Sequence, residues 1–318
     1  MPDPSLYRRA YPSAARLTHW TARDGWPLRR FDWPAKGPAR GAILFQGGRG
    51  DIIEKYLEAF AHWRARGWAI TAFDWRGQGG SGRLSNDPHV GHATDFGEYV
   101  ADLAGFWADW SRTAPGPRIA IGHSMGGHLI LRALTEQAID PQAAVLVAPM
   151  LGLHAPFGWA GAGERLARLL ARLGDPARAA WRDNEIPGAK SPRQALLTHD
   201  ATRYDDELFW KRAHPELALG PPSWAWVIEA FASTRTLRAD PRLADIATPI
   251  LALVADADRL VSAKAALATL ERLPDARTVR FGPESAHEIL READPVRSRA
   301  LAEIDRFLAR IPAPAPVA

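Results

Sequence analysis

The sequence predicts an α/β fold built on a mostly parallel, doubly wound sheet. Apolar runs of four to seven residues alternate with amphipathic helical segments over residues 41–148 and again over residues 249–311. Strands that are apolar on both faces belong to parallel sheets that helices cover on both sides. The chain has 318 residues, 47% of them hydrophobic, which suits one large domain with an insertion or two domains.

A β-hairpin is predicted before the alternating part. Residues 16–21 and 28–33 have the composition of strands, and Asp24-Gly25 between them is a common hairpin turn. A hairpin of this kind adds antiparallel strands to a sheet that is otherwise parallel.

The alternating part begins at residue 41. Short apolar runs predict strands, and apolar residues three or four positions apart predict helices. The predicted strands are residues 41–46, 68–74, 118–122, 143–148, 249–254 and 278–281, and the predicted helices are residues 52–66, 96–110, 125–134, 263–273 and 295–311.

Residues 151–233 interrupt the alternation. This segment has leucines at helical spacing, several prolines and five tryptophans, namely Trp159, Trp181, Trp210, Trp224 and Trp226. We predict a helical insertion that divides the core into residues 1–150 and 234–311, followed by a disordered tail at residues 312–318. The insertion is either a lid with an apolar underside or an ordinary small subdomain, and the sequence favours neither.

Composition excludes several classes of site and partner. The chain has no cysteine, which excludes disulfides, thiolate metal sites and a cysteine nucleophile. Its net charge is +4 without any basic run, so we do not expect nucleic acid as a partner. No apolar stretch is long enough for a signal peptide or an integral membrane segment, and we expect a cytoplasmic protein.

A candidate nucleophile lies in the middle of the first core portion. Residues 122–126 are Gly-His-Ser-Met-Gly, a G-x-S-x-G pattern centred on Ser124. The pattern alone is modest support, but a strand-like run precedes it and a helix-like run follows it, as a nucleophile elbow requires. Such a turn strains the serine backbone, and glycines on either side leave room for the neighbouring strand and helix. We predict that Ser124 is a nucleophile rather than part of a turn without chemistry.

A serine nucleophile needs a histidine base and a carboxylate that orients the base. On this kind of fold the acid and then the histidine follow the serine, each after a later strand. Asp256 and Asp258 follow the strand at residues 249–254, and His287 alone among ten histidines follows a strand beyond them. We favour Asp258, which lies further into the loop, and keep Asp256 in reserve.

The oxyanion that forms during attack on a carbonyl needs backbone N–H donors. Met125, directly after the candidate nucleophile, is expected to supply one donor. The second is expected from the glycine-rich loop at residues 47–50. A phosphate-binding loop is the alternative, but the Walker-type Gly-Lys-Ser/Thr is missing.

Residues 74–82, Asp-Trp-Arg-Gly-Gln-Gly-Gly-Ser-Gly, form a second polar loop after a strand. They lie outside the order of serine, acid and histidine. We predict a structural loop, a local hydrogen-bonded turn in which Asp74 and Arg76 pair.

The motifs together resemble the α/β-hydrolase superfamily and, within it, the monoacylglycerol lipase and bacterial lysophospholipase group. The resemblance rests on Gly48-Arg49, residues 74–82, residues 122–127, and residues 257–260 with His287. It covers about residues 41–147 and 243–310 and implies the α/β-hydrolase fold.

The resemblance also implies site residues and a role for the insertion. It implies the triad Ser124, Asp258 and His287, no metal or organic cofactor, and a cap over an acyl pocket. It makes the N–H groups of Arg49 and Met125 the oxyanion hole, with Gly48 in reserve for Arg49. Lipase members often carry histidine where this chain has Gly47, which should alter the stability of the turn more than the chemistry.

We therefore predict a serine hydrolase of carboxylic esters. The expected substrate is a small apolar ester such as a monoacylglycerol or lysophospholipid, and we allow for transient contact with a membrane surface. Three alternatives remain: an amide, peptide or carbon–carbon bond hydrolase with the same triad, a non-catalytic receptor on the same scaffold, and an interaction protein whose partner surface is the tryptophan-rich insertion.

Overall fold

The computed structural model describes residues 7–154, 160–172, 174–181 and 193–312. Trp159 and all but the first residue of the predicted tail lie outside these ranges.

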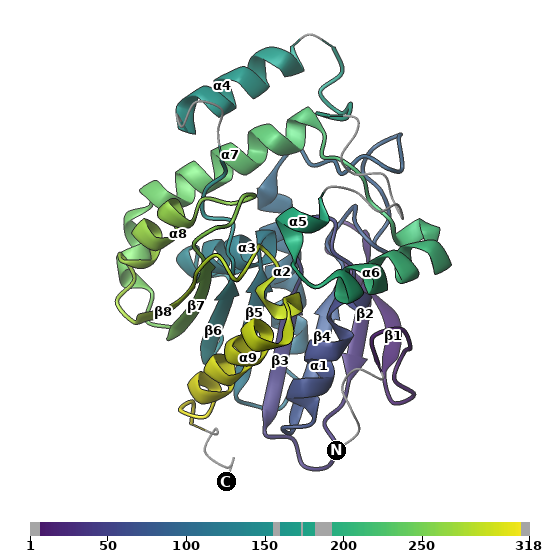
Figure 1. Cartoon of the computed structure of the whole chain (residues 1–318), viewed down its shortest axis with the longest axis vertical. Helices are drawn as coiled ribbons and strands as arrows, with labels where there is room; N and C mark the ends of the chain where they lie inside the picture. The colour runs from purple at the N-terminus through teal and green to yellow at the C-terminus, as the bar shows by residue number, and fades with distance from the viewer. Residues whose placement is uncertain (1–6, 155–159, 173, 182–192, 313–318) are drawn as a thin grey trace.

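The described residues form an eight-stranded sheet (Figure 1). Its order is β1-β2-β4-β3-β5-β6-β7-β8. The pairs β1–β2 and β2–β4 are antiparallel, and every later pair is parallel. The strands are β1 (Arg16–Thr21), β2 (Pro27–Trp33), β3 (Gly41–Gln46), β4 (Trp68–Phe73), β5 (Arg118–His123), β6 (Ala143–Val147), β7 (Ile250–Ala255) and β8 (Ala276–Phe281). The predicted α/β fold is therefore confirmed.

Helices connect the strands and cover both faces of the sheet (Figure 1). The described residues also form four short 3-10 helices: η2 (Ile53–Tyr56), η4 (Pro215–Leu217), η5 (Pro241–Asp245) and η6 (Ile289–Arg291). The α-helices are α1 (Leu57–Arg64), α2 (Phe96–Trp110), α3 (Met125–Thr135), α4 (Ala160–Ala171), α5 (Gln194–Leu197), α6 (Ala201–Ala213), α7 (Trp224–Ala239), α8 (Ala263–Leu270) and α9 (Asp294–Leu308).

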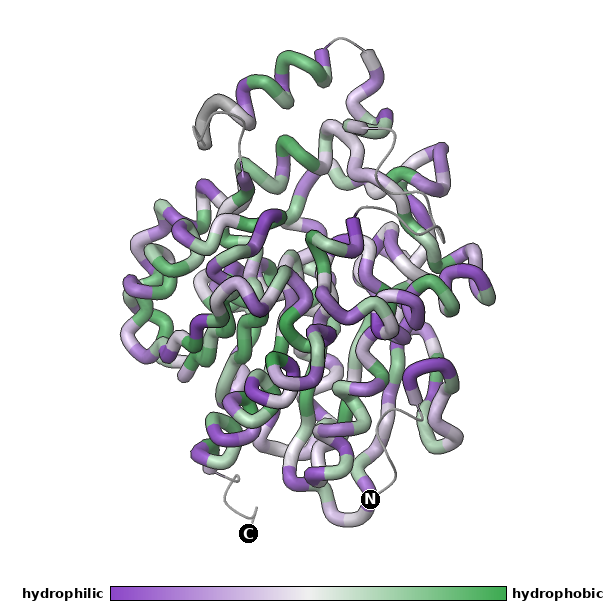
Figure 2. Tube along the Cα trace, viewed as in Figure 1, coloured by the Kyte–Doolittle hydropathy of each residue, from purple (hydrophilic) through white to green (hydrophobic). Residues whose placement is uncertain are grey.

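The core has one hydrophobic layer on each face of the sheet. In β5, Ile119 and Ile121 face the layer that contains α1 and α9, whereas Ala120 faces the layer that contains α2, α3 and α8. In Figure 2 hydrophobic segments gather in the middle of the sheet. Each fully buried isoleucine stabilises the fold by about 1.5–3 kcal/mol, so burial on both faces holds these strands at the centre.

Polar side chains fix where several helices begin. Asp95 accepts a hydrogen bond from the N–H of Gly97 at the start of α2, at 2.6 Å. Ser223 accepts one from the N–H of Trp226 in α7, at 3.1 Å. Such caps satisfy N–H groups that have no partner within the helix and are worth about 0.5–2 kcal/mol each.

Residues 151–233, the predicted insertion, include several helices in their described part. They contain α4, α5, α6 and η4, and α4 packs against α7 at the outer edge of the molecule (Figure 1). α7 continues without interruption to Ala239, so the expected boundary at residue 233 falls within a helix. The predicted helix at residues 52–66 is divided into η2 and α1.

Strand order places the site. β3 lies between β4 and β5, so the chain moves to one side of β3 and then returns to the other. In open α/β sheets a crevice forms beyond the carboxyl ends of the strands where the order reverses in this way. The glycine loop after β3 and Ser124 after β5 both lie at this crevice.

Candidate active site

Ser124 occupies the strained turn between β5 and α3. Its φ is +51° and its ψ is −115°, values that a residue with a side chain rarely adopts. A Cβ on Gly122 would lie 2.6 Å from the backbone of Gly126, and a Cβ on Gly126 would lie 2.4 Å from the carbonyl oxygen of Gln46. The two glycines therefore let strand, turn and helix approach closely, as the sequence predicted.

Asp258 and His287 meet at the ends of β7 and β8. The Nδ1 atom of His287 lies 2.6 Å from Oδ2 of Asp258, and both side chains are buried. The other carboxylate oxygen, Oδ1, accepts hydrogen bonds from the N–H groups of Leu260 and Val261, at 2.8 and 3.0 Å. Because the carboxylate is an acceptor, Nδ1 carries the proton and Nε2 is left as the basic nitrogen.

The charges of this pair shift both pKa values. Burial by itself raises the pKa of Asp258, but the His287 charge, the hydrogen bond to it and the two N–H donors lower that pKa below its ordinary value. Burial lowers the pKa of His287, but the charge of Asp258 and the hydrogen bond to it raise that pKa above 6.5. The carboxylates of Glu288 and Asp51 act in the same direction.

Asp256 lies elsewhere. Its Oδ1 accepts a hydrogen bond from Nε of Arg280 at 2.9 Å, in a half-exposed ion pair on β8. Of the two aspartates that the sequence offered, the structure brings Asp258 to His287.

A cavity of about 150 Å³ lies between these elements. Ser124 and His287 line it together with Gly48 and Arg49 from the loop after β3. Met125, the other expected oxyanion donor, follows Ser124 as the first residue of α3, where the N–H groups have no partner within the helix. The remaining lining residues are Asp51, Lys55, His123, Met150, Leu153, Trp181, Arg193, Leu197, Pro222, Trp226, Leu260, Val261 and Glu288.

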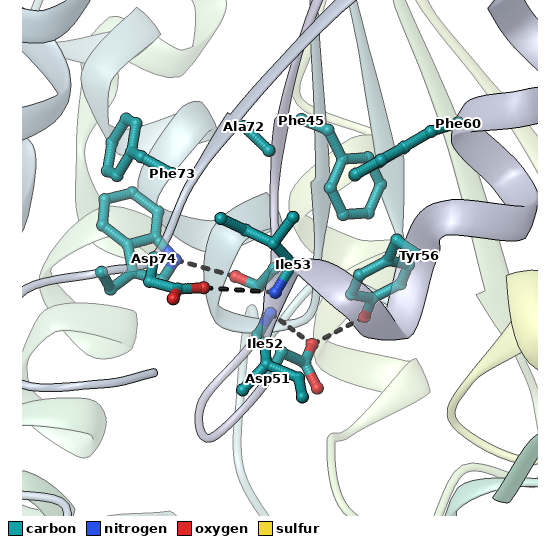
Figure 3. A pocket seen from close by; sticks show the side chains of 12 residues that line it. Phe45, Asp51, Ile52, Ile53, Tyr56, Phe60, Ala72, Phe73 and Asp74 are labelled. Carbon is teal, nitrogen blue, oxygen red and sulfur yellow. Dashed lines mark hydrogen bonds between the residues drawn. The ribbon is translucent and has the colours of Figure 1, made fainter. Parts of the chain in front are cut away.

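The glycine loop after β3 is held on both sides. Nε1 of Trp75 donates a hydrogen bond to the carbonyl oxygen of Gly47 at 2.8 Å, and the N–H of Gly48 donates one to Oδ2 of Asp51 at 2.6 Å (Figure 3). The N–H of Gly50 donates to Oε1 of Gln78 at 2.6 Å. The amide of Gly48 is therefore already engaged with a carboxylate.

The loop at residues 74–82 is structural, but its predicted internal pair is wrong. Asp74 instead accepts a hydrogen bond from Arg29 of β2 at 2.7 Å. Arg76 donates to Asp102 of α2 and to Asp24 of the hairpin, at 2.6 and 2.5 Å. All three partners, Arg29, Asp102 and Asp24, come from segments that are distant along the chain.

Sequence reasoning missed a buried polar group beside the site. Asp51, Lys55 and Tyr56 follow the glycine loop, and His123 precedes Ser124. The ring of His123 lies 4.8 Å from the ring of His287, measured between centroids. In the sequence, this group could have been recognised from Asp51 and Lys55, two charged residues at the start of a segment whose other residues predict a buried helix.

No group of three or more histidine, aspartate or glutamate residues in the described ranges is arranged to hold a metal ion. Within those ranges, no helix has the length and apolar character needed to cross a membrane.

The chain is similar in sequence to several known proteins. Residues 37–294 match the model of a family described as serine aminopeptidase, S33. The chain belongs to this family. It is also 31% identical to lysophospholipase L2 of Escherichia coli strain K12, over 92% of this chain and 86% of that protein. The monoacylglycerol lipase of Mycolicibacterium smegmatis is 24% identical over 89% of this chain and 94% of its own length.

Solved structures agree on the fold of this family member. A soluble variant of monoglyceride lipase from Saccharomyces cerevisiae superimposes with a TM-score of 0.73, at 18% identity, over 95% of this chain and 98% of that chain. Paleococcus ferrophilus monoacylglycerol lipase gives 0.68 at 20% identity, over 90% and 99%. The predicted resemblance to the monoacylglycerol lipase and lysophospholipase group is confirmed.

Proposed function

We propose that this chain is a serine hydrolase that cleaves carboxylic esters of lipid-like molecules through an acyl-enzyme on Ser124. The proposal rests on one observation: Ser124 and His287 line the same cavity, and Asp258 is hydrogen-bonded to Nδ1 of the imidazole. That arrangement can activate a hydroxyl group, position a base and hold a carbonyl beside both.

In the proposed reaction, Nε2 of His287 takes the proton of the Ser124 hydroxyl as its oxygen attacks the ester carbonyl. Asp258 keeps the proton on Nδ1 and stabilises the imidazolium that forms. The N–H groups of Met125 and Arg49 receive the oxyanion. His287 then gives its proton to the departing alcohol, and water repeats the sequence on the acyl-enzyme.

Arg49 is preferred to Gly48 as the second oxyanion donor. The reserve donor, the N–H of Gly48, points to Oδ2 of Asp51 at 2.6 Å. A charge-assisted hydrogen bond of this kind is strong, so diverting it to a substrate would leave a buried carboxylate short of a donor.

The walls of the cavity support an apolar acyl group. They include Met150, Leu260 and Val261, and the insertion adds Leu153, Trp181, Leu197, Pro222 and Trp226. We propose that residues 151–233 form a cap over this acyl pocket, because these five side chains come from them. Carboxylic esters with a medium or long acyl chain, such as monoacylglycerols or lysophospholipids, fit such a lining.

The proposal includes transient contact of α4 with a lipid surface. Leu166 and Leu169 are 43% and 57% exposed on the outer side of this helix, between the exposed Arg165 and Arg172, while Ala167 is buried. An outward face that mixes apolar and basic side chains suits an anionic lipid surface. Sedimentation with anionic phospholipid vesicles should be lost in a Leu166→Glu, Leu169→Glu variant that still hydrolyses a short nitrophenyl ester. Unchanged sedimentation would refute the contact.

Kinetics on a graded panel of substrates test the proposed function. We expect turnover of nitrophenyl esters that increases with acyl length, together with turnover of a monoacylglycerol or a lysophospholipid. The description of the family as serine aminopeptidases keeps amide cleavage as the second candidate, and aminoacyl nitroanilides belong in the panel for that reason. Faster cleavage of the anilides than of the esters would overturn the ester proposal.

The cytoplasmic location and the alternative of a non-catalytic receptor stay predictions. The cytoplasmic location is tested by fractionating cells that express the protein. A non-catalytic receptor would bind esters without turning them over, and the same substrate panel separates it from an enzyme.

A further inference from the structure

One buried carboxylate outside the proposed triad binds the loop that is to hold the oxyanion. Oδ2 of Asp51 accepts hydrogen bonds from the N–H of Gly48 and the hydroxyl of Tyr56, both at 2.6 Å. Nδ1 of His123 lies 3.0 Å from the same oxygen, and Oδ1 accepts one from Nζ of Lys55 at 2.5 Å. The side chain of Asp51 is 6% exposed.

These contacts require an ionised Asp51. Burial would raise the pKa of this carboxyl, but the ammonium group of Lys55 and the hydrogen bond from His123 keep that pKa well below its ordinary value. An ionised carboxylate has only acceptors to offer, and each of its four neighbours here carries a donor. The hydroxyl of Tyr56 also lies 2.8 Å from Nδ1 of His123. When this hydroxyl donates to Asp51, Nδ1 of His123 meets the carboxylate with its N–H, and that contact holds the residue next to Ser124 in place.

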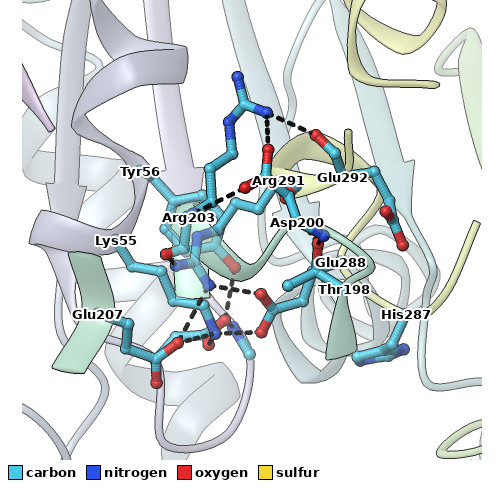
Figure 4. A network of polar contacts seen from close by, with 12 residues as sticks. Lys55, Tyr56, Thr198, Asp200, Arg203, Glu207, His287, Glu288, Arg291 and Glu292 are labelled. Carbon is cyan, nitrogen blue, oxygen red and sulfur yellow. Dashed lines mark hydrogen bonds and ion pairs between the residues drawn. The ribbon is translucent and has the colours of Figure 1, made fainter. Parts of the chain in front are cut away.

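Lys55 is itself held by two other segments. Its Nζ donates to Oε1 of Glu288, the residue after His287, and lies 3.3 Å from Oε2 of Glu207 in α6 (Figure 4). Arg291 donates to the same two carboxylates, at 2.5 Å for Glu288 and 3.0 Å for Glu207. Through Lys55, the loop that carries His287 and helix α6 of the insertion thus hold Asp51 in place.

We infer that Asp51 is a positioning residue of the hydrolase, which fixes the loop after β3 and His123 so that the oxyanion donors and Ser124 face the same cavity. This inference rests on the proposed function. The carboxylate of Asp51 touches none of the reacting atoms of that function and acts through Gly48 and His123. Lys55 supplies the charge that keeps Asp51 ionised in a buried place.

A purely structural role for Asp51 is the competing explanation, and Glu54 provides a matched control. Glu54 is also a buried carboxylate at the start of the same segment, three residues away, and it pairs with Arg29 at 2.7 Å. Glu54 accepts hydrogen bonds from Arg29 and Tyr11, whereas Asp51 accepts one from the glycine loop itself. Asp51→Asn and Glu54→Gln therefore make the same chemical change with different consequences for that loop.

The experiment compares these two variants by steady-state kinetics, melting temperature and hydrogen exchange of residues 47–50. We expect Asp51→Asn to lower kcat on a nitrophenyl ester by about 10- to 100-fold with KM within about 3-fold, since a misplaced donor costs up to what a removed donor costs. Fluorophosphonate labelling of Ser124 should slow by a similar factor. Exchange at residues 47–50 should quicken. Glu54→Gln should lower the melting temperature while kcat and exchange at the loop stay within about 3-fold of the parent.

Three outcomes would overturn the inference. The first is a stable Asp51→Asn variant with the parent's kcat. The second is equal loss of kcat in both variants at equal loss of melting temperature, which would indicate general destabilisation. The third is unchanged exchange at residues 47–50 in Asp51→Asn. The exchange measurement does not depend on hydrolysis, so it decides the positioning role even if the parent protein cleaves none of the esters.

Discussion

Nδ1 of His287 and Oδ2 of Asp258 lie 2.6 Å apart although 29 residues separate them in the chain. The two residues follow neighbouring parallel strands, β7 and β8, so the pairing of these strands brings them together. The distance is that of a charge-assisted hydrogen bond. It leaves the opposite nitrogen of the imidazole for the candidate nucleophile and makes several consequences measurable.

The pH dependence of turnover should report the environment of His287. Burial lowers the pKa of His287, but Asp258, Glu288 and Asp51 raise it above 6.5. A general base must be neutral, so activity falls as the pH drops through that pKa. We expect kcat/KM to fall on the acid side with an apparent pKa above 6.5. A midpoint clearly below 6.5 would contradict this assignment.

The two aspartates after β7 should differ sharply when replaced. Asp258→Asn removes the charge that orients His287, and we expect kcat to fall on the order of 10⁴-fold, as in other serine hydrolases. Asp256→Asn removes only the pairing with Arg280, and kcat should stay within about 3-fold. Ester hydrolysis by both variants checks this. A reversed order would make Asp256 the acid.

Removing the cation of a buried ion triad should destabilise the fold strongly. Arg29 is bound to Glu54 and Asp74, each at 2.7 Å, and both carboxylates are almost fully buried. Arg29→Met would leave two buried carboxylates without their cation, so we expect the free energy of unfolding to fall by about 3–5 kcal/mol.

Arg112 is the matched control for Arg29. Arg112 pairs with Asp109 on the surface, where both side chains are largely exposed. Arg112→Met should change the free energy of unfolding by less than about 1 kcal/mol. Urea denaturation measures both variants, and equal effects would show that burial of the triad does not matter.

Gly126 should tolerate no side chain. An added Cβ would lie 2.4 Å from the carbonyl oxygen of Gln46 and 2.6 Å from that of Gly47. Gly126→Ala must therefore push the glycine loop away from α3. We expect the free energy of unfolding to fall by about 1–3 kcal/mol or more and kcat to fall with it. Denaturation and kinetics of this variant check both effects, and a variant equal to the parent in both would contradict the close approach.

The sequence predicted the strands well because burial on both faces leaves a pattern that a single segment can display. β3, for example, is apolar from Gly41 to Phe45 and lies as predicted. The elbow at Ser124 was equally visible, since the glycines two positions before and after it, Gly122 and Gly126, follow from local crowding. The order of acid and histidine along the chain was enough to select His287 and the pair Asp256 and Asp258 as candidates. Asp258 was favoured because it lies further into the loop, and the structure brings this residue to His287.

Contacts between distant segments were beyond such reasoning. The predicted pair of Asp74 and Arg76 was wrong because β2 pairs with β4 and brings Arg29 to Asp74. The role that we infer for Asp51 depends on His123, which reaches it from β5. It depends also on Lys55, which is close to Asp51 in the chain but is held by Glu288 and Glu207 from distant segments. A charged residue in an otherwise buried segment shows that a partner exists but not which one it is.

The activation of Ser124 as a nucleophile is tested most directly by the mass of the intact protein after reaction with a fluorophosphonate, followed by mapping of the modified residue. An activated Ser124 should acquire one phosphonyl group, and the Ser124→Ala variant should acquire none. A parent protein that remains unmodified at Ser124, or a Ser124→Ala variant that is modified as fast as the parent, would contradict a nucleophilic Ser124.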